Sequence, residues 1–262
     1  MLAHQKMYQT IEFGWAYLSD LSLRETYLIE TYLDKTGKTV DAGTGGGRIL
    51  LSLKTLGFND LYGFDFVPEF IEVAKQRDAS HSIVYDVKDA TCLDYQDNFF
   101  DQILYLEQII CCIEDDSARF NALKQAHRIL KKGGIALFSF LSFDARIRSP
   151  MYLPCLVYLS LLRKLCKSQH SIQYLPCLKL GRKAGSHRQP GSGTFNWLAL
   201  LDRPPYTYWY KLQEAYQVLR AANFEVVAIG SDYQISQNKM HLLPETLVNQ
   251  PLQGMLYFVC KK

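Results

Sequence analysis

Three glycines at alternate positions, directly after a short apolar run, constrain the fold of this chain more than any other feature. The run Val40-Asp41-Ala42 is followed by Gly43, Gly45 and Gly47, and then by the apolar segment Ile49-Leu50-Leu51. This order predicts a buried strand, a tight turn and the start of a helix. Glycines let a ligand approach the backbone of such a turn, and the amides at the helix start face that ligand. The pattern therefore predicts an α/β unit with a nucleotide site at the end of its first strand.

The spacing of the glycines excludes two common kinds of nucleotide site. The dinucleotide fingerprint G-x-G-x-x-G would need a glycine where Arg48 stands, and a P-loop would need Gly-Lys-Ser/Thr. A second predicted strand, residues 61–65, ends at Asp65, close to the offset of about 20 residues at which an acid accepts the hydroxyl protons of a ribose. The chain continues with predicted helices at 69–77 and 117–130, the second stopping at Lys131-Lys132-Gly133-Gly134, and with strands at 83–87, 100–106 and 135–141.

Together these segments resemble the class I S-adenosylmethionine (SAM)-dependent methyltransferases over residues 39–142. The pattern D-x-G-x-G-x-G from Asp41 is similar to motif I of that family, and Lys88-Asp89-Ala90 is similar to its segment beside adenine. F-D-x-[IV] from Phe100 and R-x-L-K-x-G-G from Arg128 match two further family patterns. The resemblance implies a Rossmann-like, doubly wound α/β/α sandwich with a seven-stranded, mostly parallel sheet in the order 3-2-1-4-5-7-6 and an inserted cap after strand five.

The same resemblance implies SAM as the cofactor, S-adenosylhomocysteine as its product, and a set of residues around them. The glycine loop would approach the methionyl part of SAM, Asp65 would hold the ribose, and Asp89 would accept from the adenine amino group. Glu107 would lie at the pocket floor, where a carboxylate could bind the amino group of SAM or act as a base, so the catalytic residue is left open. The expected cofactor-binding residues are Asp41, Gly43, Thr44, Gly45, Asp65, Phe66, Asp89, Ala90, Leu106 and Glu107.

Length and composition fit one domain over residues 1–262, because a chain of 262 residues can bury one large α/β core. We divide it into an N-terminal helical region (1–36), a SAM-binding core (37–142), an acceptor-side cap (143–205) and a C-terminal helix with the last strands (206–262). Seven scattered cysteines, an odd number, indicate reduced thiols and a cytoplasmic location. No apolar run reaches membrane-spanning length.

The inserted segment differs in charge from the rest of the chain. Residues 145–201 hold nine Lys or Arg and no Asp or Glu, although the whole chain has a net charge of only +3. Its apolar stretch 151–162 could cover an apolar acceptor, lie on a membrane surface, or pack as a plain cap helix. Cys155, Cys166 and Cys177 lie near His170, but close CxxC pairs are missing, so no metal site is predicted. The aromatic segment 204–211 could contact the acceptor or hold the cap against the core.

The predicted function is transfer of a methyl group from SAM to a small-molecule acceptor, apolar or anionic, by direct in-line displacement. An RNA-modifying methyltransferase is one alternative, suggested by the basic insertion. It is disfavoured by the apolar runs within that insertion and by Leu106-Glu107-Gln108 in place of Asn/Asp-Pro-Pro-Tyr, so a nucleic-acid partner is not expected. A SAM-binding protein without turnover is the other alternative. The acceptor, the methylated atom and the oligomeric state stay open.

Overall fold

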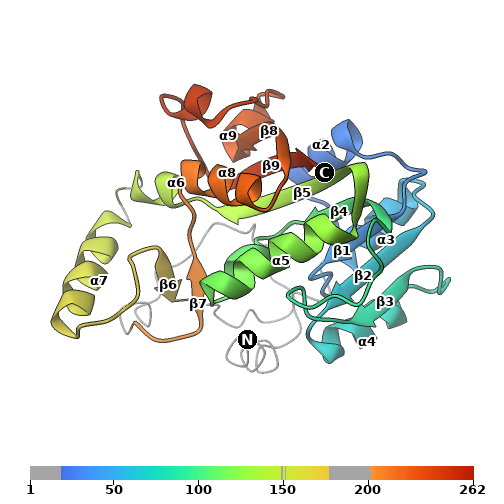
Figure 1. Cartoon of the computed structure of the whole chain (residues 1–262), viewed down its shortest axis with the longest axis horizontal. Coiled ribbons are helices and arrows are strands. Elements are labelled where there is room, and N and C mark those ends of the chain that lie inside the picture. The colour runs from blue at the N-terminus through green and yellow to red at the C-terminus, as the bar shows by residue number, and fades with distance from the viewer. Residues whose placement is uncertain (1–18, 149, 151, 177–201) are drawn as a thin grey trace.

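A twisted sheet of seven strands runs through the middle of the molecule (Figure 1). The computed structural model describes residues 19–148, 150, 152–176 and 202–262. The strand order is β3-β2-β1-β4-β5-β9-β8, which confirms the expected order 3-2-1-4-5-7-6 because β6 and β7 belong to the cap. Strands β1 to β5 pair in parallel, and β9 is antiparallel to both β5 and β8. The bounds are β1 Thr39–Ala42, β2 Leu61–Asp65, β3 Val84–Val87, β4 Phe100–Tyr105, β5 Leu130–Leu141, β8 Glu225–Ser231 and β9 Met255–Lys261.

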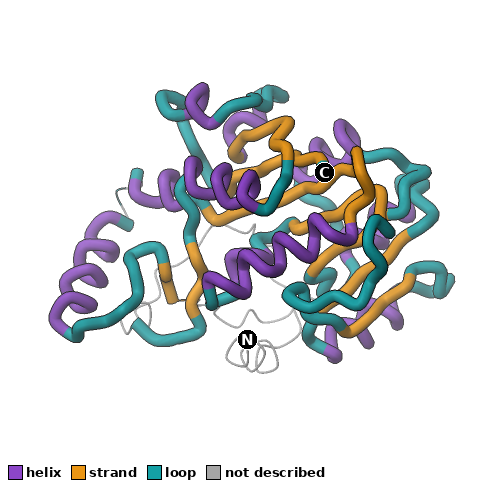
Figure 2. The backbone as a smooth tube through the Cα atoms, viewed as in Figure 1, coloured by secondary structure: helices purple, strands orange, loops and turns teal. Residues whose placement is uncertain are grey.

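Helices cover both faces of the sheet, so that the strands lie between two helical layers (Figure 2). On one face pack α5 (Asp116–Ile129) and α8 (Leu212–Ala221), together with the short helices η1 (Ile109–Cys112) and η3 (Pro244–Leu247). On the other face pack α2 (Leu23–Tyr32), α3 (Arg48–Thr55), α4 (Pro68–Arg77) and α9 (Asp232–Ser236). Because both faces of the sheet are covered, every residue of β1 and all but one of β4 are buried, polar residues included.

Helix α5 ends close to its expected position, but β5 starts earlier than expected. The helix stops at Ile129, and Leu130 is already extended, fully buried and paired with Phe100. The ladder then shifts register and resumes at Gln102 and Ile135. The helix therefore ends within one residue of the expected position, and residues 130–134, expected as a turn before the strand, form the first part of β5. At the end of α8, Asn223 has the left-handed conformation (φ 71°) expected of a helix stop.

The cap follows β5 and lies to one side of the sheet (Figure 1). It contains α6 (Phe143–Ile147), α7 (Leu153–Leu165) and an antiparallel pair, β6 (Tyr174–Pro176) and β7 (Tyr206–Tyr208). Strand β7 begins just beyond the expected cap boundary at residue 205, yet it pairs with β6. A small apolar core of Phe143, Leu156, Leu159 and Leu175 holds the cap together.

The described part of the expected N-terminal helix is α2. Its start is fixed by a capping box in which the Ser22 hydroxyl accepts from the Glu25 amide and Glu25 accepts from the Ser22 amide. Residues 1–18 of the expected helical region lie outside the described residues. Among the residues that the structure describes, no helix has the length and apolar character needed to cross a bilayer.

Candidate functional site

The glycine loop leaves β1 in a conformation that favours glycine at each alternate position. Gly43, Gly45 and Gly47 have φ angles of 65°, 53° and 78°, and Gly47 caps the start of α3. A Cβ on Gly43 would lie 2.3 Å from Ile109 Cδ1, whereas a Cβ on Gly45 would meet nothing within 4 Å. The loop therefore passes close to η1 on one side and borders open space on the other.

Asp65 connects this loop to the next helix. Its Oδ2 accepts from the Gly45 amide and its Oδ1 from the Val67 amide, each at 3.0 Å. One carboxylate at the end of β2 thus fixes both the glycine turn and the entry to α4. A carboxylate offers about four lone-pair positions, so further donors from a ligand can still bind to it.

A cavity of about 220 Å³ lies at the carboxyl ends of β1, β2 and β4. All ten residues expected to bind the cofactor line it, although the role of each stays a prediction. They are Asp41, Gly43, Thr44, Gly45, Asp65, Phe66, Asp89, Ala90, Leu106 and Glu107. Parallel strands end at one edge of a sheet, which is why residues up to 66 positions apart in sequence (41 to 107) meet there.

Two carboxyl groups in the cavity wall are deeply buried. Burial raises the pKa of Asp41 to about 7, and its Oδ2 has no hydrogen-bond partner among the described residues. Burial likewise raises the pKa of Asp65 to about 6, against the opposing effect of the amides of Val67 and Gly45. A ligand that brings hydrogen-bond donors or positive charge would stabilise the charged form of both carboxyl groups.

Two further acids occupy tight turns. Asp89 follows β3, and its Oδ1 accepts from both the amide and the hydroxyl of Thr91 at 2.9 Å. Glu107 and Gln108 follow β4 with φ angles of 54° and 62°, an uncommon conformation for residues other than glycine. The Gln108 amide donates to Ser139 Oγ at 2.9 Å, which helps to hold this turn in place. Such strained turns persist where the surrounding structure determines them, often at binding sites.

Sequence reasoning missed the role of Arg48 at the first position of α3. Its guanidinium lines the cavity and donates to both carboxylate oxygens of Glu25, at 2.6 and 2.8 Å. Glu25 lies on α2 and is only 2% exposed. This buried ion pair therefore connects α2 to the end of the glycine loop. A signal was present in the sequence, because a cation at a helix N-terminus opposes the helix dipole and requires a compensating partner.

The cavity extends beyond the expected residues toward α5. Ile109, Cys112, Ile113 and Ala118 form an apolar wall there, and Glu114 and Asp115 add negative charge. These residues follow no recognisable motif. Among the residues that the structure describes, the lining holds six acids (Asp41, Asp65, Asp89, Glu107, Glu114 and Asp115) against two cations (Arg48 and Lys88). This balance favours a cationic ligand.

Arg119 fixes the cap beside this end of the cavity. It is 3% exposed and donates to the carbonyls of Ile113 and Glu114 at 2.8 Å and to the Tyr174 hydroxyl at 3.0 Å. Its guanidinium also lies over the ring of Tyr208, 4.1 Å from the centroid. Tyr206, Tyr208 and Tyr210 are buried, and within the described residues the aromatic segment 204–211 adds nothing to the cavity lining. Its observed contacts therefore hold the cap on the core.

Several cations of the insertion are engaged in contacts inside the protein. Arg163 is 5% exposed, forms an ion pair with Asp202 (Nε to Oδ2, 2.8 Å) and donates to the Ser171 carbonyl. Arg146 lies between the rings of Tyr152 and Trp209, 4.1 Å from each centroid. The positive charge of Arg146 and Arg163 is therefore held inside the cap rather than on a solvated basic face. Lys179, Arg182, Lys183 and Arg188 lie outside the described residues.

Comparison with known proteins finds methyltransferases that are similar to this chain. A family model described as "Methyltransferase domain" matches residues 40–138. A curated relative, the ubiquinone/menaquinone biosynthesis C-methyltransferase UbiE of a Geobacter species, is 32% identical over 108 residues, which cover 39% of this chain and 44% of the relative. The chain thus spans less than half the length of that relative.

Two solved structures share the fold. A SAM-dependent methyltransferase from Methanosarcina mazei superposes with a TM-score of 0.63 at 16% identity, covering 94% of this chain and 99% of that one. The 1,6-didemethyltoxoflavin-N1-methyltransferase of Burkholderia thailandensis, solved with its substrate and S-adenosylhomocysteine, gives 0.53 at 14% identity over 99% and 82%. At these identities the likeness establishes a common architecture.

Proposed function

We propose that the chain is a class I, SAM-dependent methyltransferase that transfers a methyl group from SAM to a small-molecule acceptor in the cavity, as its match to a methyltransferase-domain model over residues 40–138 and its fold support. One observation carries the proposal: the glycine loop and Asp65, hydrogen-bonded to each other, border a cavity in which acids outnumber cations. SAM combines a ribose, which needs acceptors, with a sulfonium cation, which a negatively charged cavity favours.

The residues present fit this cofactor. The open space beside Gly45 would be reduced by any side chain there, and the buried Asp41 oxygen lacks a donor among the described residues. In our assignment Gly43, Thr44 and Gly45 hold the methionyl part and Asp65 holds the ribose. Phe66, Asp89 and Ala90 surround the adenine, and Leu106 and Glu107 form the floor.

The bound cofactor supplies a methyl group that is already activated on sulfur. The chain contributes alignment and the exclusion of water. Leu106, Ile109 and Ile113 form an apolar wall in which an acceptor loses its hydration shell. The tight turn at Glu107 and Gln108 holds the floor rigid, so that alignment costs little reorganisation.

The charge of the lining narrows the acceptor class. Glu114 and Asp115 lie at the end of the cavity nearest the cap, next to the apolar wall. We therefore propose an acceptor with an apolar body and no net negative charge, since an anion would be repelled there. The methylated atom stays open, because the curated relative is named a C-methyltransferase and the toxoflavin enzyme an N1-methyltransferase.

RNA remains the second candidate acceptor because of the basic insertion. An acidic cavity repels phosphates, however, and Arg146 and Arg163 are engaged within the cap. To decide, the purified chain is incubated with methyl-labelled SAM and either an RNA fraction or a small-metabolite fraction. We expect label and S-adenosylhomocysteine only with the metabolites. Labelled RNA would favour the second candidate, and no transfer together with tight SAM binding would favour a binding protein without turnover.

Cofactor binding is tested by calorimetric titration with SAM and with S-adenosylhomocysteine. Gly45→Val should abolish the binding heat, because the side chain enters the open space beside the loop and strains its backbone. Gly133→Val is the matched control. Gly133 also has a positive φ, 78°, and a Cβ added to it would likewise meet nothing within 4 Å, but it does not line the cavity. A wild-type chain that shows no heat with either ligand would overturn the proposal.

A further inference from the structure

The outer face of α7 exposes a continuous row of large apolar side chains. Leu153, Val157, Leu161 and Leu165 follow one another at intervals of four, so they lie along one side of the helix. Each is between 52% and 82% exposed, and Tyr158 beside them is 43% exposed. The opposite side of α7 packs Leu156 and Leu159 into the core of the cap. The helix is thus apolar on two faces, of which only the inner one is covered by the residues that the structure describes.

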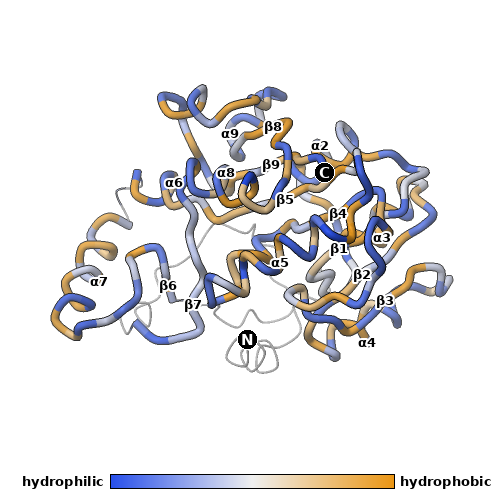
Figure 3. The backbone as a smooth tube through the Cα atoms, viewed as in Figure 1, coloured by the Kyte–Doolittle hydropathy of each residue, from blue (hydrophilic) through white to orange (hydrophobic). Residues whose placement is uncertain are grey.

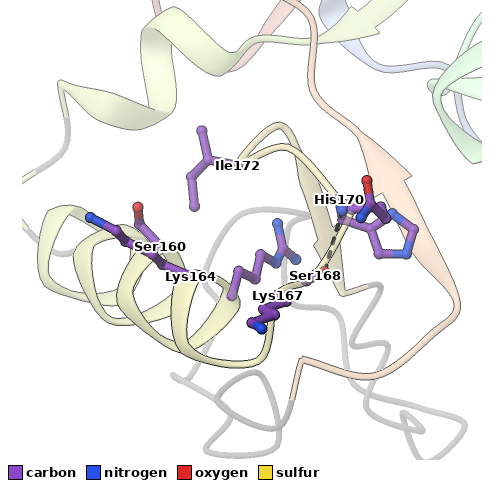
Figure 4. Close-up of a pocket in the computed structure, with 8 residues that line it drawn as sticks. Ser160, Lys164, Lys167, Ser168, His170 and Ile172 are labelled. Atoms are coloured by element: carbon purple, nitrogen blue, oxygen red, sulfur yellow. Dashed lines mark hydrogen bonds between the residues drawn. The ribbon is translucent and has the colours of Figure 1, made fainter.

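Positive charge borders this apolar row. Lys164 follows Ser160 along its edge, and both are exposed. Beyond the end of the helix, Lys167, Ser168 and His170 line a shallow pocket of about 390 Å³. Figure 4 shows Ser160 and Lys164 extending from α7, and Lys167, Ser168 and His170 on the segment after it. The Ser168 hydroxyl accepts from the His170 amide at 3.3 Å, which holds this turn together.

Figure 3 shows the same change along the chain, from hydrophobic colouring over much of α7 to hydrophilic colouring in the loop that leads to β6. The sequence supplies no carboxylate between residues 145 and 201. The nearest acid after this segment, Asp202, forms an ion pair with Arg163. Lys164 and Lys167 therefore have no acidic neighbour in sequence that would neutralise them.

We propose that α7 docks the protein on the surface of a bilayer that contains anionic phospholipid. The apolar row inserts among the acyl chains near the headgroups, and Lys164 and Lys167 bind lipid phosphates at the same depth. An apolar stripe bordered by cations is the arrangement by which amphipathic helices bind in the interface plane. At 13 residues α7 is too short to span a bilayer, so the contact is a surface contact.

The position of α7 suits this contact. It lies at the far end of the cap, away from the sheet, so a flat surface can approach its outer face (Figure 1). The cavity of the candidate site is lined by none of the α7 residues that the structure describes. Docking therefore leaves the cofactor site accessible, and the proposal is independent of which acceptor is methylated.

The test is co-sedimentation of the full chain with vesicles of phosphatidylcholine, with and without phosphatidylglycerol. We expect binding only with the anionic lipid, weakened by salt. Leu161→Glu should abolish it. Lys164→Gln together with Lys167→Gln should weaken it roughly 25-fold, at about fivefold for each lysine near an anionic surface.

Matched controls come from other surfaces of the molecule. Leu243→Glu alters an apolar residue that is 51% exposed, and Lys75→Gln with Lys132→Gln removes two exposed charges far from α7 in sequence. All controls should bind like the parent, and calorimetric SAM titration shows that every variant is folded. Equal binding to both kinds of vesicle, or full binding by Leu161→Glu, would overturn the proposal. Self-association without lipid, lost in Leu161→Glu, would assign this face to a second copy of the chain and would also overturn it.

Discussion

Two buried carboxyl groups determine how the cavity responds to ligand and to pH. Asp65 uses its oxygens to hold the amides of Gly45 and Val67, so it shapes the cavity as well as lining it. Asp41 keeps one oxygen without a partner among the described residues, at the end of a fully buried strand. Changes at the two positions should therefore have different consequences.

Asp65→Asn should weaken SAM binding by at least about tenfold. The new NH₂ group faces a backbone amide where an oxygen accepted before, and a hydrogen bond to a charged group contributes about 1.5–3 kcal/mol. Calorimetric titration measures the loss. Asp60→Asn, at a half-exposed acid before β2, is the control and should bind SAM normally. Unchanged affinity in Asp65→Asn would contradict the assignment of the ribose to this residue.

Asp41 should make stability fall as the pH rises. Its pKa is about 7 in the folded protein, whereas an unperturbed aspartate has a pKa of 3.8, so between these values the folded state binds more protons than the unfolded state. Relative to Asp41→Asn, the parent should lose up to about 1.4 kcal/mol per pH unit across that window. Urea unfolding of both proteins at about pH 5 and about pH 7 gives the difference. A constant difference between the two proteins would refute this expectation.

Helix α2 shows how one ion pair positions an entire element. The ion pair of Arg48 with Glu25 connects the first turn of α3 to α2, and the capping box at Ser22 fixes the start of α2. The spacing of apolar residues predicted a helix here. The ion pair could not be predicted, because it joins residues 23 positions apart and no local sequence pattern indicates it. The strands of the seven-stranded sheet were predicted from short segments, each containing apolar residues, that alternate with predicted helices. Strand β6 was not predicted, because three residues are too few to show the alternation of apolar and polar residues that indicates a strand.

Arg48→Met should lower the free energy of unfolding by about 3–5 kcal/mol, because Glu25 would stay buried without its partner. The double variant Arg48→Met with Glu25→Met should recover most of this loss, since two apolar side chains replace the pair. Urea unfolding gives both values. Arg24→Met, which breaks the more exposed pair with Asp232, should cost less than about 1 kcal/mol. Equal losses in the two single variants would show that burial of the pair is unimportant.

On the scale of the whole molecule, the sequence pattern predicted the alternation of strands and helices, and the resemblance to a known family implied the layers, the strand order and the place of the cap. The resemblance also led to ten of the residues that line the cavity, because each lies at or just beyond the end of a strand of the parallel sheet, while the role of each stays a prediction. It could not predict the wall toward α5, which depends on how η1 turns. Nor could it separate cations that bind inside the cap from those that face solvent, because Arg163 finds its partner 39 positions away at Asp202.

Asp202→Asn should loosen the cap without changing the cofactor site. The residue has a φ of 44°, which asparagine also tolerates, so the substitution removes mainly the charge that pairs with Arg163. Limited proteolysis should cut the cap faster than in the parent, while calorimetry shows the same SAM affinity. Asp97→Asn, at an exposed acid paired with Arg128, is the control. Unchanged proteolysis would mean that other contacts, such as those of Arg119, suffice to hold the cap.

The place of β9 has a consequence for synthesis on the ribosome. Strand β9 pairs with β5 and β8 inside the sheet, yet more than a hundred residues separate the end of β5 from the start of β9. At about 5–20 residues per second, that edge of β5 stays without its partner for about 5–20 s after it emerges. An unpaired edge is a template for joining other chains. The nascent protein therefore passes through an interval of seconds in which that edge is open to pairing with other chains.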